Sequence, residues 1–510
     1  MGISPPTVTI PKLVVSRERL IRGRISLVLI LVVAILYCVF LIPFSWILLP
    51  VPFVWVRRQY RRWVSTVQLL LLGFLGYALE FICRIRIVVT GGEELLHILP
   101  GKPLIISNHH CELDWMFLVC LSLRLHRLSL LKLTTWEDFV HVPFIGWLIQ
   151  AFAFIPICGR DKVRDLATIR NVIEYLTGIQ HPMGGCTVGI FPEGCSLTTA
   201  NSLEKSHRYA ERVGLPRLNQ VLIPRAAGVY ETIRTLNRLN SVDSVIDVTI
   251  AYMDFIPFEY SSIASFWTGK YPREVHLNLS QVRWVDIPMS DVESVNTWLI
   301  ERWIQKERLL ERFYSPLNFI DMSDVMDGGG GGGGDGGMGD PGDEFDQLST
   351  TSTHMSNLAT LLTFYDDDGT EPCEETLSKD MRFIQYISNS YVISAVVALM
   401  VISLMIAVSV AYPERVLLYV LSVCLIFSVV TRWINGFNVF ELEVLPVQVD
   451  LMANEYYPVD MDLKPKGFIE ELREFFSSPK NELEAGRKDK DSYIRAMKNR
   501  RMAIRQSQLA

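Results

Sequence analysis

The chain has 510 residues, of which 49% are hydrophobic and 20% charged, and its formal net charge at pH 7 is −6. This length suits one sizeable catalytic domain with additional segments, and we expect no nucleic-acid partner for a chain of weak net acidity. The nine cysteines form no C-x-x-C pair, a distribution that argues against both a disulfide framework and a structural zinc site.

The first apolar run, residues 25–56, contains no charged residue. As a single helix it would be about 48 Å long, well beyond a hydrocarbon core of roughly 30 Å, and we expect the prolines from Pro43 onward to interrupt it. The basic segment RRQYRR (57–62) and a shorter uncharged stretch (63–79) follow. Two arrangements remain open for this N-terminal membrane anchor, residues 1–83: a pair of spanning helices, or a helical hairpin held in one leaflet.

The following segment, residues 84–321, alternates short β-rich runs with amphipathic helical patterns. This alternation predicts an α/β domain with a central mixed sheet flanked by helices. The predicted strands are 84–89, 103–107, 187–191, 221–224, 245–252 and 274–279, and the clearest helical patterns are 161–177 and 293–314.

Polar clusters follow three of these predicted strands. SNHHCELD comes after PLIIS, PEGCSL after TVGIF, and PRAAG after VLI. In open α/β sheets, ligands bind beyond the carboxyl ends of the strands. We therefore expect the three turns to contribute to one site.

The C-terminal part of the chain divides into three segments. A Gly- and Asp-rich stretch cannot bury a core, so we predict a disordered linker over 322–378. Two apolar runs, 391–411 and 416–430, predict a membrane hairpin over 379–433. The polar, basic tail 434–510 is compatible with a solvated segment and equally with a patch on an anionic membrane surface.

The cluster HHCELD leaves several chemistries open when spacing alone is considered. On an ideal helix His110 and Asp114, four positions apart, share a face, whereas His109 lies five positions from Asp114 and is rotated by about 140°. Spacing alone therefore slightly favours His110 as the partner of the aspartate. A metal hydrolase built on the cluster and a thiol enzyme using Cys111 or Cys195 are the alternatives.

Seven stretches in the same order resemble the glycerolipid acyltransferases, which acylate glycerol-3-phosphate and lysophospholipids from acyl-CoA. The resemblance is greatest to the lysocardiolipin and lysophosphatidate acyltransferases of eukaryotic membranes. The stretches are SNHHCELDWMF (107–117), VPFIGW (142–147), FIPICGRD (154–161), FPEGCSLT (191–198), VLIPRAAG (221–228), DVTIAY (247–252) and YPREVHLNL (271–279).

This resemblance implies that His109 is the general base and that Asp114 orients its imidazole, as in the NHxxxxD motif of the family. The assignment requires His109 to lie in the turn before the helix, with Asn108 shaping that turn and forming part of the substrate site. His110 then has a non-catalytic role, either at the helix start or in lining the pocket. Acyl-CoA is an activated co-substrate, so neither a covalent intermediate, a metal nor a further cofactor is expected.

The resemblance also implies the residues that hold the acceptor. Glu193 and Gly194 match the motif that holds the glycerol-phosphate region. Many family members continue with threonine and arginine, whereas this chain has Cys195 and Ser196. We therefore expect Arg160 to be the cation for the acceptor phosphate, because a guanidinium suits bidentate contact.

Pro224 and Arg225 match a block that the family uses on the acyl-donor side, and a structural role for both is the equal alternative. The predicted function is an acyl-CoA-dependent O-acyltransferase for lysophosphatidate, lysophosphatidylinositol or lysocardiolipin, acting at a lipid bilayer. The resemblance implies the endoplasmic reticulum membrane, with mitochondria-associated membrane as a second location. A thiol-dependent acyl-thioesterase and a non-catalytic membrane scaffold are the alternative functions.

Overall fold

The computed structural model describes residues 15–46, 54–91, 102–180, 185–197, 200–253, 263–314 and 374–433. The predicted tail lies outside these residues. So does the predicted linker, apart from its last residues, which belong to a helix that begins at Glu374.

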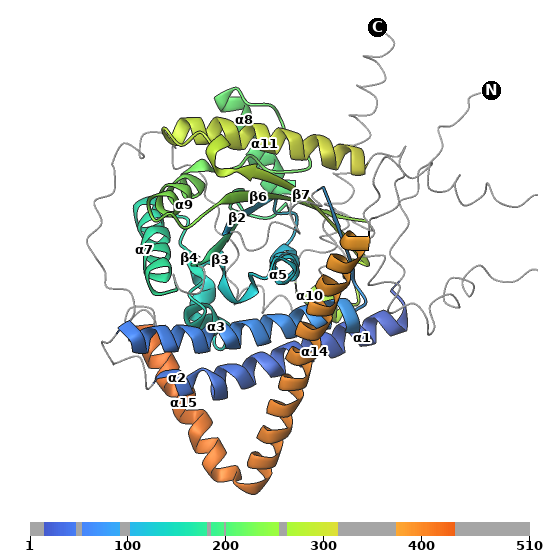
Figure 1. Ribbon diagram of the computed structural model, residues 1–510, viewed down its shortest axis with the longest axis vertical. Helices are drawn as coiled ribbons and strands as arrows, with labels where there is room; N and C mark the ends of the chain where they lie inside the picture. Colours follow the sequence, from blue (N-terminus) through green and yellow to red (C-terminus); the bar gives the residue numbers. More distant parts are fainter. Residues whose placement is uncertain are drawn as a thin grey trace, which may run out of the picture.

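A seven-stranded mixed sheet lies at the centre of the domain, with strand order β1-β7-β6-β2-β5-β3-β4 (Figure 1). β6, β2, β5, β3 and β4 run parallel to one another, whereas β7 pairs antiparallel with β6 and parallel with β1. The predicted α/β fold with a central mixed sheet is confirmed. The strands are β1 (Arg86–Thr90), β2 (Pro103–Ser107), β3 (Leu131–Trp136), β4 (Ile155–Ile157), β5 (Thr187–Ile190), β6 (Ser244–Tyr252) and β7 (Glu274–Arg283).

One predicted strand, 221–224, is wrong, and β3 and β4 were not predicted. The backbone N–H groups of Leu222 and Ile223 donate to the side chains of Glu193 (3.2 Å) and Ser206 (2.9 Å), so this segment bonds side chains instead of a neighbouring strand. β3 contains Lys132, a charge inside a buried strand. Its ammonium donates to the carbonyl of Phe152 at 2.6 Å, a contact that the local pattern does not reveal.

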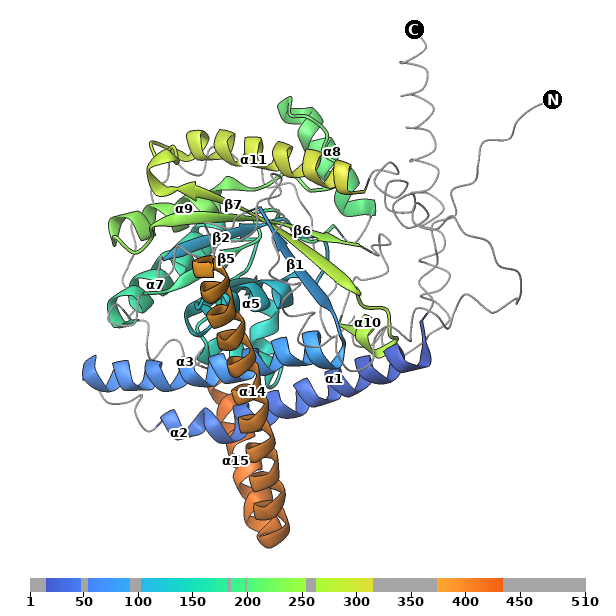
Figure 2. The same ribbon diagram turned by 45° about the vertical axis from the view of Figure 1, so that its right-hand side comes forward.

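Helices cover both faces of the sheet and create two cores (Figures 1 and 2). Alternate residues of β2 enter different cores, because side chains along a strand point to opposite faces: Leu104 and Ile106 pack with α7, α9 and α11, and Ile105 packs with α3 and α5. The helices of the domain are α5 (Asp114–Arg124), α6 (Ile145–Ala151), α7 (Lys162–Gln180), α8 (Ala200–Val213), α9 (Ala226–Arg238), α10 (Ala264–Trp267) and α11 (Val292–Phe313). The 3-10 turns are Leu128–Leu130, Glu137–His141 and Trp284–Asp286.

Four helical segments are long and apolar enough to cross a membrane: Arg17–Ser45, Trp55–Ile82, Asn389–Ala411 and Pro413–Thr431. The first includes α1 (Arg17–Leu36), a π-helical turn (Tyr37–Leu41) and α2 (Pro43–Trp46). The second includes α3 (Val54–Tyr77) and a π-helical turn (Ala78–Ile82), and the last two lie in α14 (Glu374–Ala411) and α15 (Pro413–Trp433).

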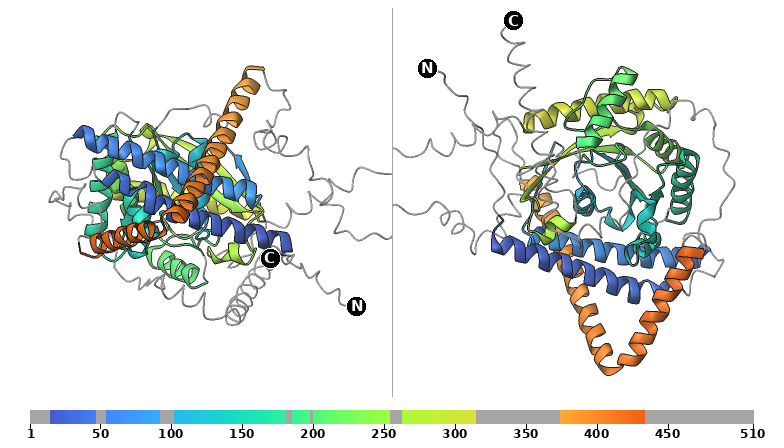
Figure 3. Two further views of the ribbon diagram at one scale, coloured as in Figure 1. Left: turned by 90° about the horizontal axis from the view of Figure 1, so that it is seen from below. Right: turned by 180° about the vertical axis from the view of Figure 1, so that it is seen from behind.

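These four segments are covered to very different extents. α1 and α3 run side by side along the base of the domain, and α14 and α15 form a hairpin that projects beyond them (Figures 2 and 3). In the most apolar part of Trp55–Ile82, 61% of the residues are buried. The corresponding shares are 11% in Asn389–Ala411 and 17% in Pro413–Thr431. α3 is therefore packed into the protein, while the segments Asn389–Ala411 and Pro413–Thr431 expose most of their apolar surface.

Candidate functional site

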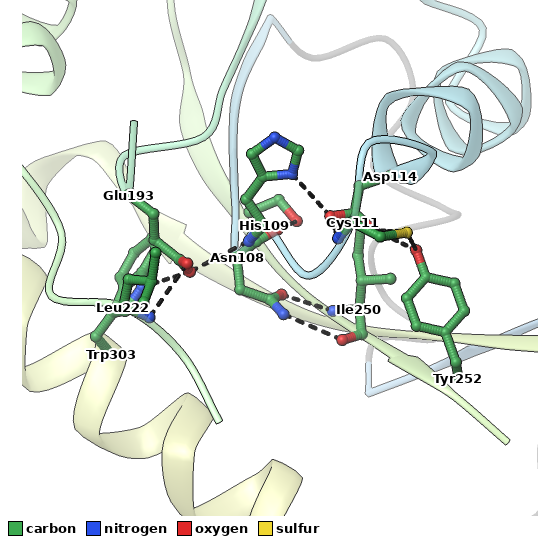
Figure 4. A network of polar contacts seen from close by, with 10 residues as sticks. Asn108, His109, Cys111, Asp114, Glu193, Leu222, Ile250, Tyr252 and Trp303 are labelled. Carbon is green, nitrogen blue, oxygen red and sulfur yellow. Dashed lines mark hydrogen bonds and ion pairs between the residues drawn. The ribbon is translucent and has the colours of Figure 1, made fainter. Parts of the chain in front are cut away.

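His109 lies in the turn between β2 and α5, and its side chain points back to the first residue of that helix. The Nδ1 atom of His109 is 2.9 Å from Oδ2 of Asp114 (Figure 4). The structure thus places His109 outside the helix, as its assignment to the aspartate required. The Asp114 side chain is fully buried and that of His109 is 19% exposed, so the imidazole remains accessible while its partner is shielded.

The Asp114 carboxylate accepts further hydrogen bonds on both oxygens. Oδ2 accepts the backbone N–H of Cys111 at 3.0 Å, and Oδ1 accepts the hydroxyl of Tyr252, the last residue of β6. Burial raises the pKa of Tyr252 well above its usual range, so its phenol remains a neutral donor. Tyr252 was not predicted as a site residue, although it ends the stretch DVTIAY at the end of a strand parallel to β2.

Asn108 holds the turn against β6. Its side-chain amide donates to the carbonyl of Ile250 at 3.1 Å and accepts the Ile250 N–H at 2.8 Å (Figure 4). Asn108 is fully buried, so these paired bonds fix the chain immediately before His109. The bonds account for the predicted shaping of the turn, and a direct contact with substrate stays a prediction.

The loop after β5 encloses His109 from three directions. The ring of Phe191 stacks on the imidazole, with centroids 4.4 Å apart and an interplanar angle of 25°. Glu193 accepts the His109 N–H at 3.2 Å, and the Leu197 N–H donates to the His109 carbonyl at 2.9 Å. The loop therefore fixes both backbone polar groups of His109 as well as one face of its ring.

Glu193 connects this loop to two other parts of the chain. Besides the His109 N–H, its carboxylate accepts the Leu222 N–H at 3.2 Å and the indole N–H of Trp303, from α11, at 3.0 Å (Figure 4). Burial raises the pKa of Glu193 to about 8, although the three N–H donors oppose that shift. The predicted contact of Glu193 with the acceptor stays a prediction. Trp303 was not predicted as a site residue and lies outside all seven stretches.

His110 faces a different environment. Its ring packs edge-on against Tyr252 and Tyr314, each with a centroid separation of 6.3 Å. Burial lowers the pKa of His110 to about 4, so the ring is neutral near pH 7. The structure therefore joins Asp114 to His109 and packs His110 among aromatic rings.

Gly194, in the loop after β5, lies next to Arg225. Gly194 has a φ of +72°, and a Cβ atom added there would lie 3.5 Å from the Arg225 guanidinium. The Arg225 N–H donates to the carbonyl of Pro192 at 2.8 Å, and Pro224 is buried. The two predicted blocks around Glu193 and Pro224 are thus brought into one place.

Arg160 lies on an exposed turn after β4. The backbone N–H groups of Cys158 and Gly159 each donate to the Asp165 carboxylate at 2.8 Å, which fixes the turn. Within the described residues, no hydrogen bond or ion pair joins Arg160 to the residues around His109. Its predicted contact with a phosphate stays a prediction.

The two cysteines near the site lack the features of an activated thiol. Burial raises the pKa of Cys111 well above its usual range and that of Cys195 to about 11. A thiol nucleophile requires the opposite shift. The part of the chain that the structure describes also has no group of three or more His, Cys, Asp or Glu side chains that could hold a metal ion.

An accessible imidazole paired with a buried carboxylate, beside the carboxyl end of a central strand, is an arrangement suited to general-base chemistry. Residues 86–253 match the family model described as Acyltransferase. The chain is 34% identical over 237 residues to lysocardiolipin acyltransferase 1 of Danio rerio (46% of this chain, 58% of the relative). It is 32% identical over 265 residues to lysocardiolipin acyltransferase 1 of Gallus gallus (52% of this chain, 67% of the relative).

A probable 1-acyl-sn-glycerol-3-phosphate acyltransferase 5 of Arabidopsis thaliana is 29% identical over 301 residues (59% of this chain, 76% of the relative). The crystal structure of the 1-acyl-sn-glycerophosphate acyltransferase PlsC from Thermotoga maritima aligns with a TM-score of 0.34 and 16% identity, covering 58% of this chain and 98% of that chain. The chain belongs to the acyltransferase family, in its group of lysophospholipid and glycerolipid acyltransferases. The resemblance found in the motifs is confirmed.

Proposed function

We propose that this protein is an acyl-CoA-dependent O-acyltransferase that esterifies the free hydroxyl of a lysophospholipid. The observation that carries the proposal is the 2.9 Å contact between Nδ1 of the partly exposed His109 and Oδ2 of the fully buried Asp114. A carboxylate on Nδ1 favours the tautomer with its proton on that atom, which leaves the Nε2 lone pair available for a substrate proton.

The reaction then proceeds in one addition and one elimination. Nε2 of His109 takes the proton of the acceptor hydroxyl as its oxygen attacks the thioester carbonyl. The C–O bond forms, the C–S bond breaks as the tetrahedral intermediate collapses, and the imidazolium returns the proton to the departing CoA thiolate. Asp114 stabilises the imidazolium between these steps, and general-base assistance of this kind contributes roughly 10²- to 10⁴-fold.

The names of the relatives support a phosphate-bearing acceptor, lysocardiolipin or 1-acyl-sn-glycerol-3-phosphate. We propose an anionic lysophospholipid, with lysophosphatidylinositol as the third candidate headgroup. Arg160, on its fixed and exposed turn, supplies a cation for the phosphate, and Arg225 adds positive charge beside Gly194.

Exposed apolar residues support a site at a membrane. Those on α1 lie along one stripe, while α14 from Asn389 onward and α15 expose many apolar side chains. We propose that α14 and α15 cross the bilayer and that α1 and α3 lie as a hairpin in one leaflet, in the endoplasmic reticulum or in mitochondria-associated membrane. The α1 stripe consists of Ile21, Ile25, Val28, Leu31, Val32 and Ile35.

The test is acyl transfer by purified protein in phosphatidylcholine vesicles, with radiolabelled acyl-CoA and a panel of lysolipids. We expect His109→Ala to lose roughly 10²- to 10⁴-fold in kcat and Cys195→Ser to retain transfer. Loss of transfer in Cys195→Ser with retention in His109→Ala would instead support the thioesterase-like thiol enzyme. Absence of transfer by the unmodified protein across the panel would support the non-catalytic scaffold.

A further inference from the structure

The helix that begins with Asp114 ends in a buried ion pair. Arg124, the last residue of α5, donates from its two Nη atoms to the two carboxylate oxygens of Glu80, each at 2.9 Å. The side chains of Arg124 and Glu80 are only 6% and 8% exposed. Glu80 lies in the π-helical turn at the end of α3, so this bidentate pair fixes α5 to the N-terminal helices.

A residue of the C-terminal hairpin completes this pair. The hydroxyl of Tyr391, on α14, donates to Oε1 of Glu80 across 311 positions of sequence, and the side chain is buried. The Tyr391 ring occupies the space above Gly76, where an added Cβ would be 2.7 Å from it, and packs edge-on against Phe81 at 5.6 Å. The Tyr391 contact therefore combines close packing of the ring with one hydrogen bond.

The other helix of the hairpin docks elsewhere. Phe427 of α15 stacks on Trp147 of α6 with centroids 4.3 Å apart, and Gln150 donates to the Thr431 hydroxyl at 3.1 Å. Tyr419, also on α15, donates to the carbonyl of Val39 at 3.0 Å. The hairpin thus has two separate attachments, and the one through Tyr391 leads to the helix of Asp114.

A shift at one end of α5 reaches the other end because a helix of this length is stiff. Arg124 and Asp114 are ten residues apart, about 15 Å along the axis. The contact between Asp114 and His109 tolerates little displacement, since a misplacement of about 1 Å can cost roughly 10²-fold in rate. Guanidinium charge at the end of α5 also complements the negative end of the helix dipole.

We propose that the C-terminal hairpin positions the helix that carries Asp114, through the chain of contacts Tyr391–Glu80–Arg124. This inference rests on the proposed acyltransferase function, because its catalytic consequence is the alignment of Asp114 with His109. Tyr391, Glu80 and Arg124 are positioning residues that do not touch the substrate. Glu80 and Tyr391 lie outside the segment matched by the family model, and Arg124 lies within it.

The chain offers a matched pair of variants for the test. Tyr391→Phe and Tyr419→Phe each remove one phenol hydroxyl from the hairpin, and only the first lies in the path to α5. In full-length protein in phosphatidylcholine vesicles, we expect Tyr391→Phe to lower kcat by roughly 3- to 30-fold with KM for acyl-CoA unchanged. The kcat of Tyr419→Phe should remain within about 2-fold of the value for the unmodified protein, because this variant loses only one neutral hydrogen bond, to the Val39 carbonyl, outside the path to α5.

A second readout is independent of catalysis. Hydrogen exchange of the amides of residues 114–124 should become faster in Tyr391→Phe and remain unchanged in Tyr419→Phe. Combining Tyr391→Phe with Glu80→Gln should slow the reaction no more than Glu80→Gln alone, because both act through the same pair.

The proposal is overturned if Tyr391→Phe keeps both the kcat and the exchange rates of the unmodified protein. Equal losses in the two tyrosine variants, with equal falls in the thermal unfolding midpoint, would also overturn it in favour of general destabilisation. If the unmodified protein transfers no acyl group, the proposed function fails, while the exchange measurement still decides whether the hairpin holds α5.

Discussion

The hydroxyl of Tyr252 donates to the carboxylate of Asp114, and the same carboxylate contacts Nδ1 of His109 at 2.9 Å. Three side chains, from the end of β6, the start of α5 and the turn after β2, therefore form one continuous path from the core of the sheet to the accessible imidazole. Tyr252 supports the charge of Asp114, and Asp114 fixes the ring of His109. Under the proposed function, we expect this order of contacts to give each residue a distinguishable effect on the reaction.

Replacing Tyr252 by phenylalanine should lower kcat by roughly 10- to 100-fold, because a hydrogen bond to a charged group contributes about 1.5–3 kcal/mol. The KM for acyl-CoA should remain unchanged, since the hydroxyl faces Asp114 and is buried away from the substrate. Steady-state kinetics at saturating lysolipid measure both constants. Tyr230→Phe, on α9, is the control, and an equal loss in that variant would contradict the assignment.

Asp114→Asn keeps the shape of the side chain but removes its charge. The amide cannot stabilise the imidazolium and can hold the wrong tautomer of His109, so we expect a loss of about 10³- to 10⁴-fold in kcat. Circular dichroism should show that the variant is folded. A folded variant with more than a tenth of the original kcat would exclude Asp114 as the orienting residue.

Trp303→Phe should destabilise the protein and slow the reaction. Loss of the indole N–H leaves one acceptor site of the buried Glu193 unfilled, which costs about 1–3 kcal/mol in the free energy of unfolding. Because Glu193 also bonds the His109 backbone, kcat should fall as well.

The matched control for Trp303→Phe is Trp284→Phe, which removes an exposed indole bond to Asn237. Urea unfolding and the acyl-transfer assay should separate the two variants, with Trp284→Phe close to the unmodified protein in both. Similar results for the two would show that the bond to Glu193 has no special role.

Lys132 should make stability depend on pH. Burial, with a smaller contribution from Arg61, lowers the pKa of Lys132 from 10.5 to about 7. Between about pH 7 and 10.5 the unfolded chain binds a proton that the folded protein does not, so the contribution of this group to the free energy of unfolding rises with pH. The expected slope is roughly 1.4 kcal/mol per pH unit, and it disappears below pH 7, where both states are protonated.

The measurement is a series of urea unfolding curves across this pH window, comparing the unmodified protein with Lys132→Met. The variant should lack this part of the slope. Lys270→Met, at a partly exposed position, is the control for removing a lysine. An unchanged slope in Lys132→Met would show that the buried ammonium is not the titrating group.

Much of the fold follows from local pattern. PLIIS is β2 at the predicted residues, because an apolar run of five residues with both faces covered reads as a buried strand. The amphipathic patterns near α7 and α11 likewise coincide with those helices. The segment 221–224 has the same apolar composition, yet it is no strand, because its N–H groups meet the side chains of Glu193 and Ser206.

The sequence by itself indicated His109 and Asp114 as candidate site residues through the seven ordered stretches, whereas helical spacing alone slightly favoured His110. His109 and Asp114 are five positions apart, and a short loop before a helix suffices to bring their side chains together. The apolar runs also predicted the helical segments that are long and apolar enough to cross a membrane, because that property depends on length and composition alone.

Only the tertiary structure decided which donors complete the buried carboxylates. Asp114 receives Tyr252 across 138 positions, Glu193 receives Trp303 across 110, and Glu80 receives Tyr391 across 311. A buried carboxylate must be hydrogen-bonded, but the requirement does not say from which element the donor comes. The donor is determined by how distant elements of the chain pack together, and the local sequence around each carboxylate does not contain that information.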